Sequence, residues 1–275
     1  MKSYFFMLFS LIFLLNSCRL NNEQNQTASS QENNYASIAF DSVIIDSTFS
    51  EYKSANLQPA FNYFYPIFKT NDTMLNSFIN QEVKTIMHAH FEEKVSNPTE
   101  YKNWFTQILK EDQSSTRELD IISNYYLDIR IDVPYVYQDY LTIAYYYSSF
   151  LGGAHPAENI EYYVFNTKTK SKVSLQSLLN EKDEKLLKLG ETAFRKDMHL
   201  SADTSLANFG YFIFGDEIYE ENDAHYGKFH FNNNFTVTPT GIYFYYNNYE
   251  IAPYAAGASY FTLPYTQYSL PKEKE

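Results

Sequence analysis

The feature that most restricts the fold is the alternation in residues 124–133, NYYLDIRIDV. The apolar positions of this run fall on one side of an extended chain: Tyr125, Leu127, Ile129, Ile131 and Val133. A period of two is typical of a β-strand with one buried face. Residues 134–139 predict a turn, and residues 140–150, YLTIAYYYSSF, predict the returning strand. The chain must therefore build an antiparallel sheet whose apolar face needs a cover.

Helices are the expected cover. Residues 75–87 repeat apolar side chains every three or four positions, which predicts an amphipathic helix. Asp72 or Thr73 would cap its start, and we expect it to run to Glu93. A weaker helical stretch surrounds Trp104. A further helix is predicted within residues 175–198, with Asn180 as its cap.

Further strands are predicted at residues 38–46, 56–68, 160–166 and 259–265, with a second hairpin in residues 230–250. In that hairpin, Pro239 suits a turn corner, and Gly241 suits a left-handed position. The 27 tyrosines and 23 phenylalanines also favour strands. The fold class is therefore α+β: antiparallel β-sheets, each covered by a helix, in two intimately packed subdomains. We expect these subdomains at residues 38–148 and 149–270.

The N-terminus has the pattern of an export signal. Lys2 precedes an apolar block at residues 4–15, which is too short to span a bilayer, and Cys18 follows. The sequence LLNSC resembles the lipobox of bacterial lipoproteins, in which the cysteine becomes the lipidated N-terminus. The alternative is an ordinary signal with a chance cysteine. We expect a signal peptide at residues 1–17, a lipid on Cys18 and a disordered tether over residues 18–37.

Charge and cysteine content limit the possible partners. The net charge of −12 argues against nucleic acid and favours cationic partners. Because Cys18 is the only cysteine, the chain cannot form an internal disulfide. Membrane contact is expected only through the lipid anchor on Cys18, and we favour the periplasmic side of an outer membrane.

His155 is the first candidate site residue. Gly152 and Gly153 allow unusual backbone angles before it, and Pro156 restricts it to extended conformations. A rigidly held histidine suits catalysis, and it equally suits a loop brace or a binding residue. No zinc-binding H-E-x-x-H motif and no G-x-S-x-G motif accompanies it. We therefore favour bracing or binding; a hydrolase using His155 with Glu158 or Glu250 is the alternative.

A second unusual stretch is residues 249–257, YEIAPYAAG. Pro253 and Gly257 bend the chain, and the alanines between them leave little bulk. We expect this segment to pack against the glycines before His155, with Glu250 or Tyr254 as the partner of that histidine.

The remaining histidines and acids give weaker signals. His88 and His90 lie two positions apart on a helix and point in different directions, so they cannot share a metal ion. His90 is expected to be packed and His88 to face solvent. Residues 203–226 hold several acids, but the spacing is not that of an EF-hand. We expect a solvated loop there, with a metal or partner site as the alternative, and we assign no catalytic residue, metal or cofactor.

The two unusual stretches carry a resemblance. GGAHP followed by GIYFYYNNYEIAPYAAGASYFTLPY resembles the bacterial extracytoplasmic family DUF3298. The stretches YFYPIF and LNSFINQEVKTI resemble its companion family, DUF4163. The pair is similar to the extracytoplasmic domain of the RsiV family of lysozyme-binding anti-sigma factors, and it also accompanies a peptidoglycan deacetylase. The resemblance covers residues 38–267.

The resemblance implies a binding module. Sigma-factor control is not expected, because the chain lacks the cytoplasmic segment and transmembrane helix of those receptors. We expect a lipid-anchored protein of the bacterial cell envelope that recognises a lysozyme-like protein or a peptidoglycan fragment. An enzyme that modifies polysaccharide and a structural component of an envelope assembly are the alternatives.

Overall fold

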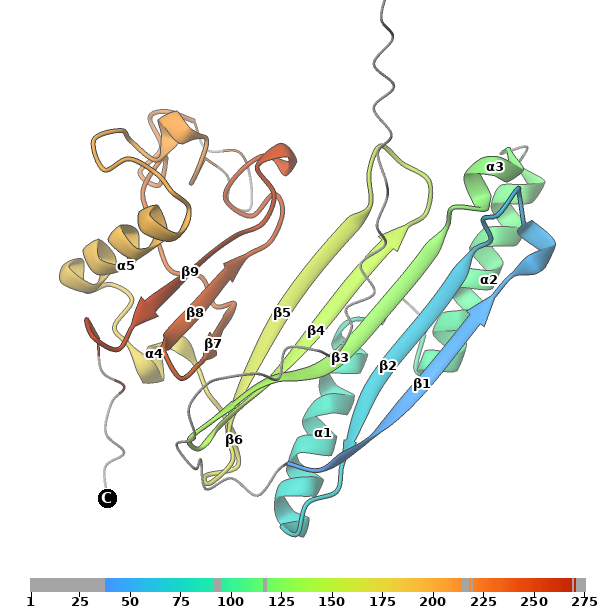
Figure 1. Ribbon diagram of the computed structural model, residues 1–275, viewed down its shortest axis with the longest axis horizontal. Coiled ribbons are helices and arrows are strands. Elements are labelled where there is room, and N and C mark those ends of the chain that lie inside the picture. The colour runs from blue at the N-terminus through green and yellow to red at the C-terminus, as the bar shows by residue number, and fades with distance from the viewer. Residues whose placement is uncertain are drawn as a thin grey trace, which may run out of the picture. The chain divides into compact units, whose positions relative to one another are not determined.

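The computed structural model describes residues 38–91, 95–115, 118–213, 218, 220–268 and 270. The expected signal peptide, Cys18 and the tether lie outside these residues. The residues from Tyr35 onward cluster as one unit. This unit contains a six-stranded sheet, a three-stranded sheet and helices, so the expected α+β class is confirmed (Figure 1).

The six-stranded sheet has the strands in chain order, from β1 to β6. Their bounds are Phe40–Thr48, Ala60–Phe68, Tyr126–Tyr137, Tyr140–Phe150, Ala157–Asn166 and Ser171–Lys172. All neighbours are antiparallel except β2 and β3, which are parallel. Only antiparallel pairing was expected from the sequence. Parallel neighbours need a long crossover, and the three helices between β2 and β3 supply it.

The first helix of this crossover agrees with its expected start. α1 spans Thr73–Ala89, and the side chain of Asp72 accepts a hydrogen bond from the backbone N–H of Leu75. The expected end at Glu93 is too late, because His90 already leaves the helical conformation as the C-cap. Glu93 itself lies outside the described residues.

The second helix is longer than expected. α2 spans Pro98–Ser114, and the Asn97 side chain accepts a hydrogen bond from the N–H of Glu100. Asn97 and Pro98, which were expected to end the preceding helix, therefore also begin α2. Proline is tolerated at the first position of a helix, because the N–H that it lacks would have no partner within the helix. A short α3, Leu119–Ile122, and a 3₁₀ turn, Ser50–Tyr52, complete this part. α1 and α2 lie on one face of the sheet (Figure 1).

The β3–β4 hairpin is tighter than expected. β3 continues through Pro134 to Tyr137, so the turn is only Gln138 and Asp139. The pairing register shifts between Asp132 and Tyr135. Proline cannot donate to the ladder, and this irregularity accommodates it without ending the strand.

The three-stranded sheet holds β7, β8 and β9 in antiparallel order. Their bounds are Phe235–Val237, Gly241–Tyr246 and Ser259–Pro264. The helix expected over residues 175–198 is two helices, α4 at Leu175–Leu178 and α5 at Glu184–Asp197. Asp183, and not Asn180, caps α5 by accepting from the N–H of Leu186. Two 3₁₀ turns, Ala207–Phe209 and Tyr254–Ala256, lie in the connections.

Gly241 is required for a different reason from the one expected. It does not lie among the glycines with positive φ. A Cβ atom placed on it would lie 2.3 Å from the backbone oxygen of Leu263 on β9. Close strand approach, and not a left-handed turn, therefore fixes glycine there.

Two hydrophobic cores meet at β5. Phe165 belongs to the core under α1 and α2, whereas its neighbour Val164 belongs to the core under α5. Successive side chains of a strand point to opposite faces, so β5 contributes to both cores. On the Val164 side, the buried hydroxyls of Thr142 on β4 and Thr236 on β7 are hydrogen bonded at 2.6 Å. The boundary expected between residues 148 and 149 falls within β4.

Candidate functional site

The loop after β4 and the loop after β8 meet through three aromatic rings. We call residues 151–156 and 249–257 the loop junction. The His155 ring stacks on Tyr254, with centroids 3.7 Å apart and planes inclined by 16°. Its Nε2 lies 3.3 Å from the hydroxyl of Tyr249, and its Nδ1 lies 2.9 Å from the carbonyl oxygen of Pro156. These contacts brace one loop against the other.

The contacts of His155 also define its chemistry. A carbonyl oxygen only accepts, so Nδ1 carries the proton in that hydrogen bond, and Nε2 of the neutral ring accepts from Tyr249. The groups that contact its ring are two tyrosines and a backbone carbonyl, and they include no carboxylate base and no activated nucleophile. The arrangement therefore provides an oriented aromatic surface.

Backbone geometry keeps this surface in place. Gly152 and Gly257 have φ of 80° and 72°, a region that glycine adopts without steric cost. Tyr249 has φ of 67°, which is unfavourable for a tyrosine, and its side chain remains 50% exposed. Gly153 has ordinary φ, and the loops meet through rings, not through close glycine packing.

Glu250 does not take the expected place beside His155. Its carboxylate accepts hydrogen bonds from Nδ2 of Asn232 at 2.7 Å and from the N–H of Asn247 at 2.8 Å. Burial raises the pKa of Glu250, and the charge of Glu161 raises it further. Tyr254 is thus the contact partner of His155, and Glu250 belongs to a different site.

A cleft of about 770 Å³ opens beside the loop junction. The end of α3, the start of β3 and the loop at residues 152–156 form its walls. Ile121, Tyr126 and Phe150 supply apolar surface, and Ile121 is 41% exposed. The junction therefore presents a ring stack next to an open, partly apolar hollow.

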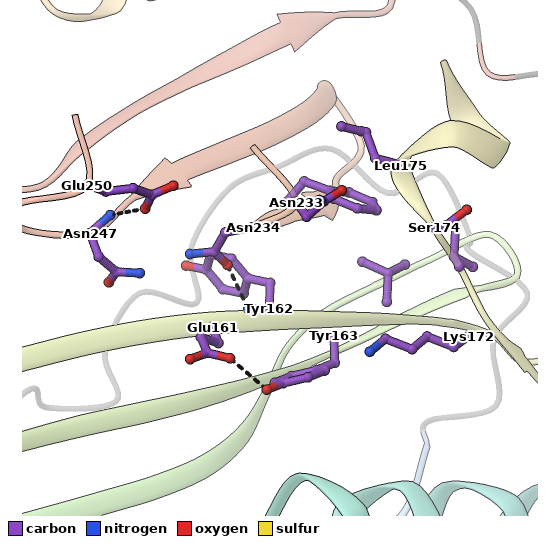
Figure 2. A pocket seen from close by; sticks show the side chains of 13 residues that line it. Glu161, Tyr162, Tyr163, Lys172, Ser174, Leu175, Asn233, Asn234, Asn247 and Glu250 are labelled. Carbon is purple, nitrogen blue, oxygen red and sulfur yellow. Dashed lines mark hydrogen bonds between the residues drawn. The ribbon is translucent and has the colours of Figure 1, made fainter. Parts of the chain in front are cut away.

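A second pocket, of about 510 Å³, lies along β5 and contains Glu250 (Figure 2). Glu161 and Tyr163 on β5 and Lys172 on β6 line it. Figure 2 shows Glu161 and Tyr163 on the opposite side of β5 from Glu250 and Asn247. Nζ of Lys172 lies 4.9 Å from the centre of the Tyr163 ring. We call this the β5 pocket.

Glu161 remains ionised in the β5 pocket. His90 lies 3.5 Å from its carboxylate, Tyr163 donates a hydrogen bond at 2.7 Å, and Asn159 donates another. These contacts lower the pKa of Glu161 to about 2 although burial acts in the opposite direction. The pocket therefore holds two carboxylates whose surroundings move their pKa values apart.

Two asparagines at the pocket satisfy the free edge of β5. Asn234 accepts from the N–H of Tyr162 and donates to the carbonyl of Ile160 (Figure 2). Asn247 accepts from the N–H of Ile160 and donates to the same carbonyl. Each amide thus substitutes for a missing strand partner. These two asparagines were not among the predicted site residues. The signal that could have indicated them is the pair of asparagine runs beside the strands, at residues 232–234 and 247–248.

The other histidines were weaker candidates for a metal site. His90 stacks on Tyr145 at 3.8 Å and hydrogen bonds Tyr163, so it is packed as expected, and His88 is exposed. Within the described residues, no group of three or more His, Cys, Asp or Glu residues could hold a metal ion. Of the acidic segment, Asp216 and Glu217 lie outside the described residues.

No described helix combines the length and apolar composition that a bilayer crossing requires.

Comparison with known proteins places one segment in a family. Residues 176–266 match the model described as "Protein of unknown function (DUF3298)". The DUF3298 segment includes Glu250, Tyr254 and Gly257, whereas Gly152, Gly153 and His155 precede it. No curated protein matches the chain.

Two solved structures share the fold. A DUF3298 family member from Bacteroides fragilis has a TM-score of 0.62 and 21% identity, covering 86% of this chain and 94% of its own. A DUF3298 family protein from Pseudomonas aeruginosa has a TM-score of 0.58 and 14% identity, with coverages of 86% and 95%. The fold therefore extends well beyond the matched DUF3298 segment, into the six-stranded sheet.

Proposed function

We propose that this protein is a lipid-anchored, non-enzymatic binding module of the bacterial cell envelope that recognises a cationic, lysozyme-like protein. The observation that carries the proposal is the exposed ring stack of the loop junction, formed by His155, Tyr249 and Tyr254. Tyrosine is enriched in the centres of protein interfaces because it offers a large, rigid contact area and a hydroxyl. The adjacent cleft gives a protruding partner side chain a place to enter.

Charge supports a cationic partner. The chain carries 33 acidic against 21 basic residues, and opposite charge accelerates encounter with a basic protein. The contacts of His155 include no carboxylate base, which weighs against a hydrolase that uses His155 with Glu158 or Glu250. Anchoring through Cys18, with the folded part outside the cytoplasm, rests on the sequence pattern alone.

Calorimetric titration of the full chain in mild detergent with a c-type lysozyme tests the proposal. We expect one-to-one binding that survives an increase of salt from about 150 mM, where the Debye length is about 8 Å. Tyr249→Ala and Tyr254→Ala should each weaken binding about tenfold, as expected for interface hot spots. Phe40→Ala, a control at the exposed end of β1, should bind like the wild type.

Three outcomes would count against the proposal. Absence of binding, or binding that disappears with salt, would exclude lysozyme as the partner class. Equal effects of the junction variants and Phe40→Ala would exclude the loop junction as the site. Binding of a peptidoglycan fragment in place of lysozyme would retain a binding module but overturn the protein partner.

A further inference from the structure

Six tyrosines from both sheets gather on one surface, which we call the tyrosine surface. They come from β3, β4, β5, β8 and β9: Tyr135, Tyr146, Tyr162, Tyr243, Tyr245 and Tyr260. The ring of Tyr162 lies 6.2 Å from that of Tyr243 and 6.3 Å from that of Tyr245. Tyr243 stacks on Tyr260 at 6.0 Å. Tyr135 and Tyr146 are close enough to interact electrostatically with the others.

These rings are available to a partner. Tyr135 and Tyr260 are 38% and 48% exposed, and the other four are half-buried. Among the described residues, none of the six hydroxyls has a hydrogen-bond partner. None of the six is fully buried either, so water can reach each of them. Burial raises the pKa of Tyr146 to about 12 and raises those of Tyr162, Tyr243 and Tyr245. At neutral pH the phenols of the tyrosine surface are therefore uncharged.

The surroundings of the tyrosine surface are acidic. Tyr146 lies near Asp132, and Tyr245 lies near Glu158 and Glu250. Arg130 is the one cation that the described residues bring to these rings. More carboxylates than cations border the rings, so a cationic group of a partner would meet favourable charge.

Arg130 shows how such a group is held. Its Cζ lies 5.8 Å from the centre of the Tyr146 ring, and its Nη2 donates to Asp132 at 2.7 Å. A guanidinium is thus held over a tyrosine face by a neighbouring carboxylate, which is a cation–π arrangement. The exposed rings of Tyr135 and Tyr260 can offer the same cation–π contact to a partner.

We propose that the tyrosine surface is a binding site for the arginine and lysine side chains of a protein partner. The class of partner in this proposal rests on the proposed function. The tyrosine surface would be a second contact area for that partner, and cation–π contacts would be the chemistry that recognises it. Arginine fits best, because its flat guanidinium stacks on a ring while its N–H groups reach carboxylates and phenol oxygens.

A titration of the full chain with a capped hexa-arginine peptide tests the site at about 150 mM salt. The control peptide replaces each arginine by citrulline, which has nearly the same shape without the charge. We expect the arginine peptide to bind and the citrulline peptide not to bind. Tyr260→Leu and Tyr135→Leu should each weaken binding about fivefold, whereas Tyr260→Phe and Tyr135→Phe, which keep the ring, should stay within about twofold. Tyr226→Leu, outside the surface, should not change binding.

The outcomes separate this site from the loop junction. If the Leu and Phe variants lose the same affinity for the arginine peptide, cation–π recognition is wrong. If Tyr226→Leu loses as much affinity as they do, the peptide binds only through the overall negative charge of the protein. Far-ultraviolet circular dichroism of each variant confirms the fold. If lysozyme fails to bind but the arginine peptide behaves as expected, the proposed partner is wrong and the tyrosine surface stands. If lysozyme binds and these variants have no effect, the tyrosine surface is wrong and the loop junction stands.

Discussion

At the scale of single residues, the β5 pocket holds two glutamates in opposite electrostatic conditions. The nearby His90 ring and hydrogen bonds from Tyr163 and Asn159 stabilise the charge of Glu161, whereas burial disfavours the charge of Glu250. A carboxylate whose pKa is depressed by folding adds stability at neutral pH, and one whose pKa is raised removes it. The two residues should therefore shape the pH dependence of stability with opposite sign.

Glu161→Gln should make the protein less stable at pH 7. The folded-state pKa of Glu161 is about 2 against an ordinary 4.5, so its contribution is complete above pH 4.5 and is lost as the pH falls towards 2. We expect a loss of about 1–2 kcal/mol, less than the full shift implies, because solvent screens a side chain that is 39% exposed. Urea denaturation at pH 7 and at pH 3 measures it, and the variant should differ less from the wild type at the lower pH.

Glu250→Gln is the matched comparison in the same pocket. Its folded-state pKa is raised, so the wild-type contribution is present below pH 4.5 and is lost as the pH rises through the folded value. The glutamine has a single amide oxygen, so it keeps only one of the two hydrogen bonds from Asn232 and Asn247, which reach different carboxylate oxygens of Glu250. Removal of the disfavoured charge offsets this loss, so at pH 7 the variant should lose less stability than Glu161→Gln does. If Glu250→Gln lowers the free energy of unfolding at pH 7 as much as Glu161→Gln does, the opposite pKa shifts of the two glutamates are wrong.

At the loop junction, the shape of the two loops was predictable from the sequence, but the partner of His155 was not. The positions of Gly152, Pro156 and Gly257 indicated two shaped loops, and these loops do meet. The choice between Glu250 and Tyr254 as partner of His155 depended on the direction in which each side chain leaves a bent backbone. Nothing in the spacing of residues 249–257 encodes that direction.

At the scale of elements, the edges of the six-stranded sheet are treated differently. β1 has an open edge, whereas the exposed edge of β5 is satisfied by the side chains of Asn234 and Asn247. These amides connect the second sheet to β5 without a ladder between strands. An unpaired backbone N–H is costly when it is shielded from water, so the two asparagines should contribute to stability.

Asn234→Ala should reduce the free energy of unfolding by about 2 kcal/mol, because the N–H of Tyr162 and the carbonyl of Ile160 each lose a hydrogen bond. Asn233→Ala is the matched control, since Asn233 is the adjacent asparagine in the chain and is exposed. Urea denaturation gives the free energies, and hydrogen exchange should accelerate at the amide of Tyr162 only in Asn234→Ala. Similar stabilities of the two variants would show that the bracing amide contributes nothing measurable.

Element boundaries were predictable where a local signal existed. Asp72 and the apolar repeat after it located α1, and the alternation in residues 124–133 located β3. The parallel pairing of β2 with β3 was not predictable, because each strand has the same local pattern in either orientation. The choice depends on the helical crossover packing against the sheet.

At the scale of the whole molecule, the two sheets share structure across the expected subdomain boundary. β4 contains that boundary, and β5 pairs with β4 while supplying Val164 to the second core. The Thr142–Thr236 hydrogen bond joins the sheets in the buried interior. We therefore expect the two sheets to unfold together.

Thr142→Val tests this connection. The substitution keeps the shape but leaves the buried Thr236 hydroxyl without its partner, so stability should fall by about 1–2 kcal/mol. Adding Thr236→Val removes the orphaned group and should recover part of the loss. Urea transitions followed by tyrosine fluorescence and by far-ultraviolet circular dichroism should coincide in all variants. Two separated transitions would contradict a shared structure.

The sequence by itself determined the α+β class, most strands, the start of α1 and the excess of negative charge. These properties follow from local periodicity, capping side chains and composition, which need no knowledge of distant contacts. Only the tertiary structure decided that six tyrosines from five strands share a surface, that asparagines complete the edge of β5, and that Tyr254 stacks on His155. Each of these depends on residues far apart in the chain, and their meeting is set by how the two cores pack on either side of β5.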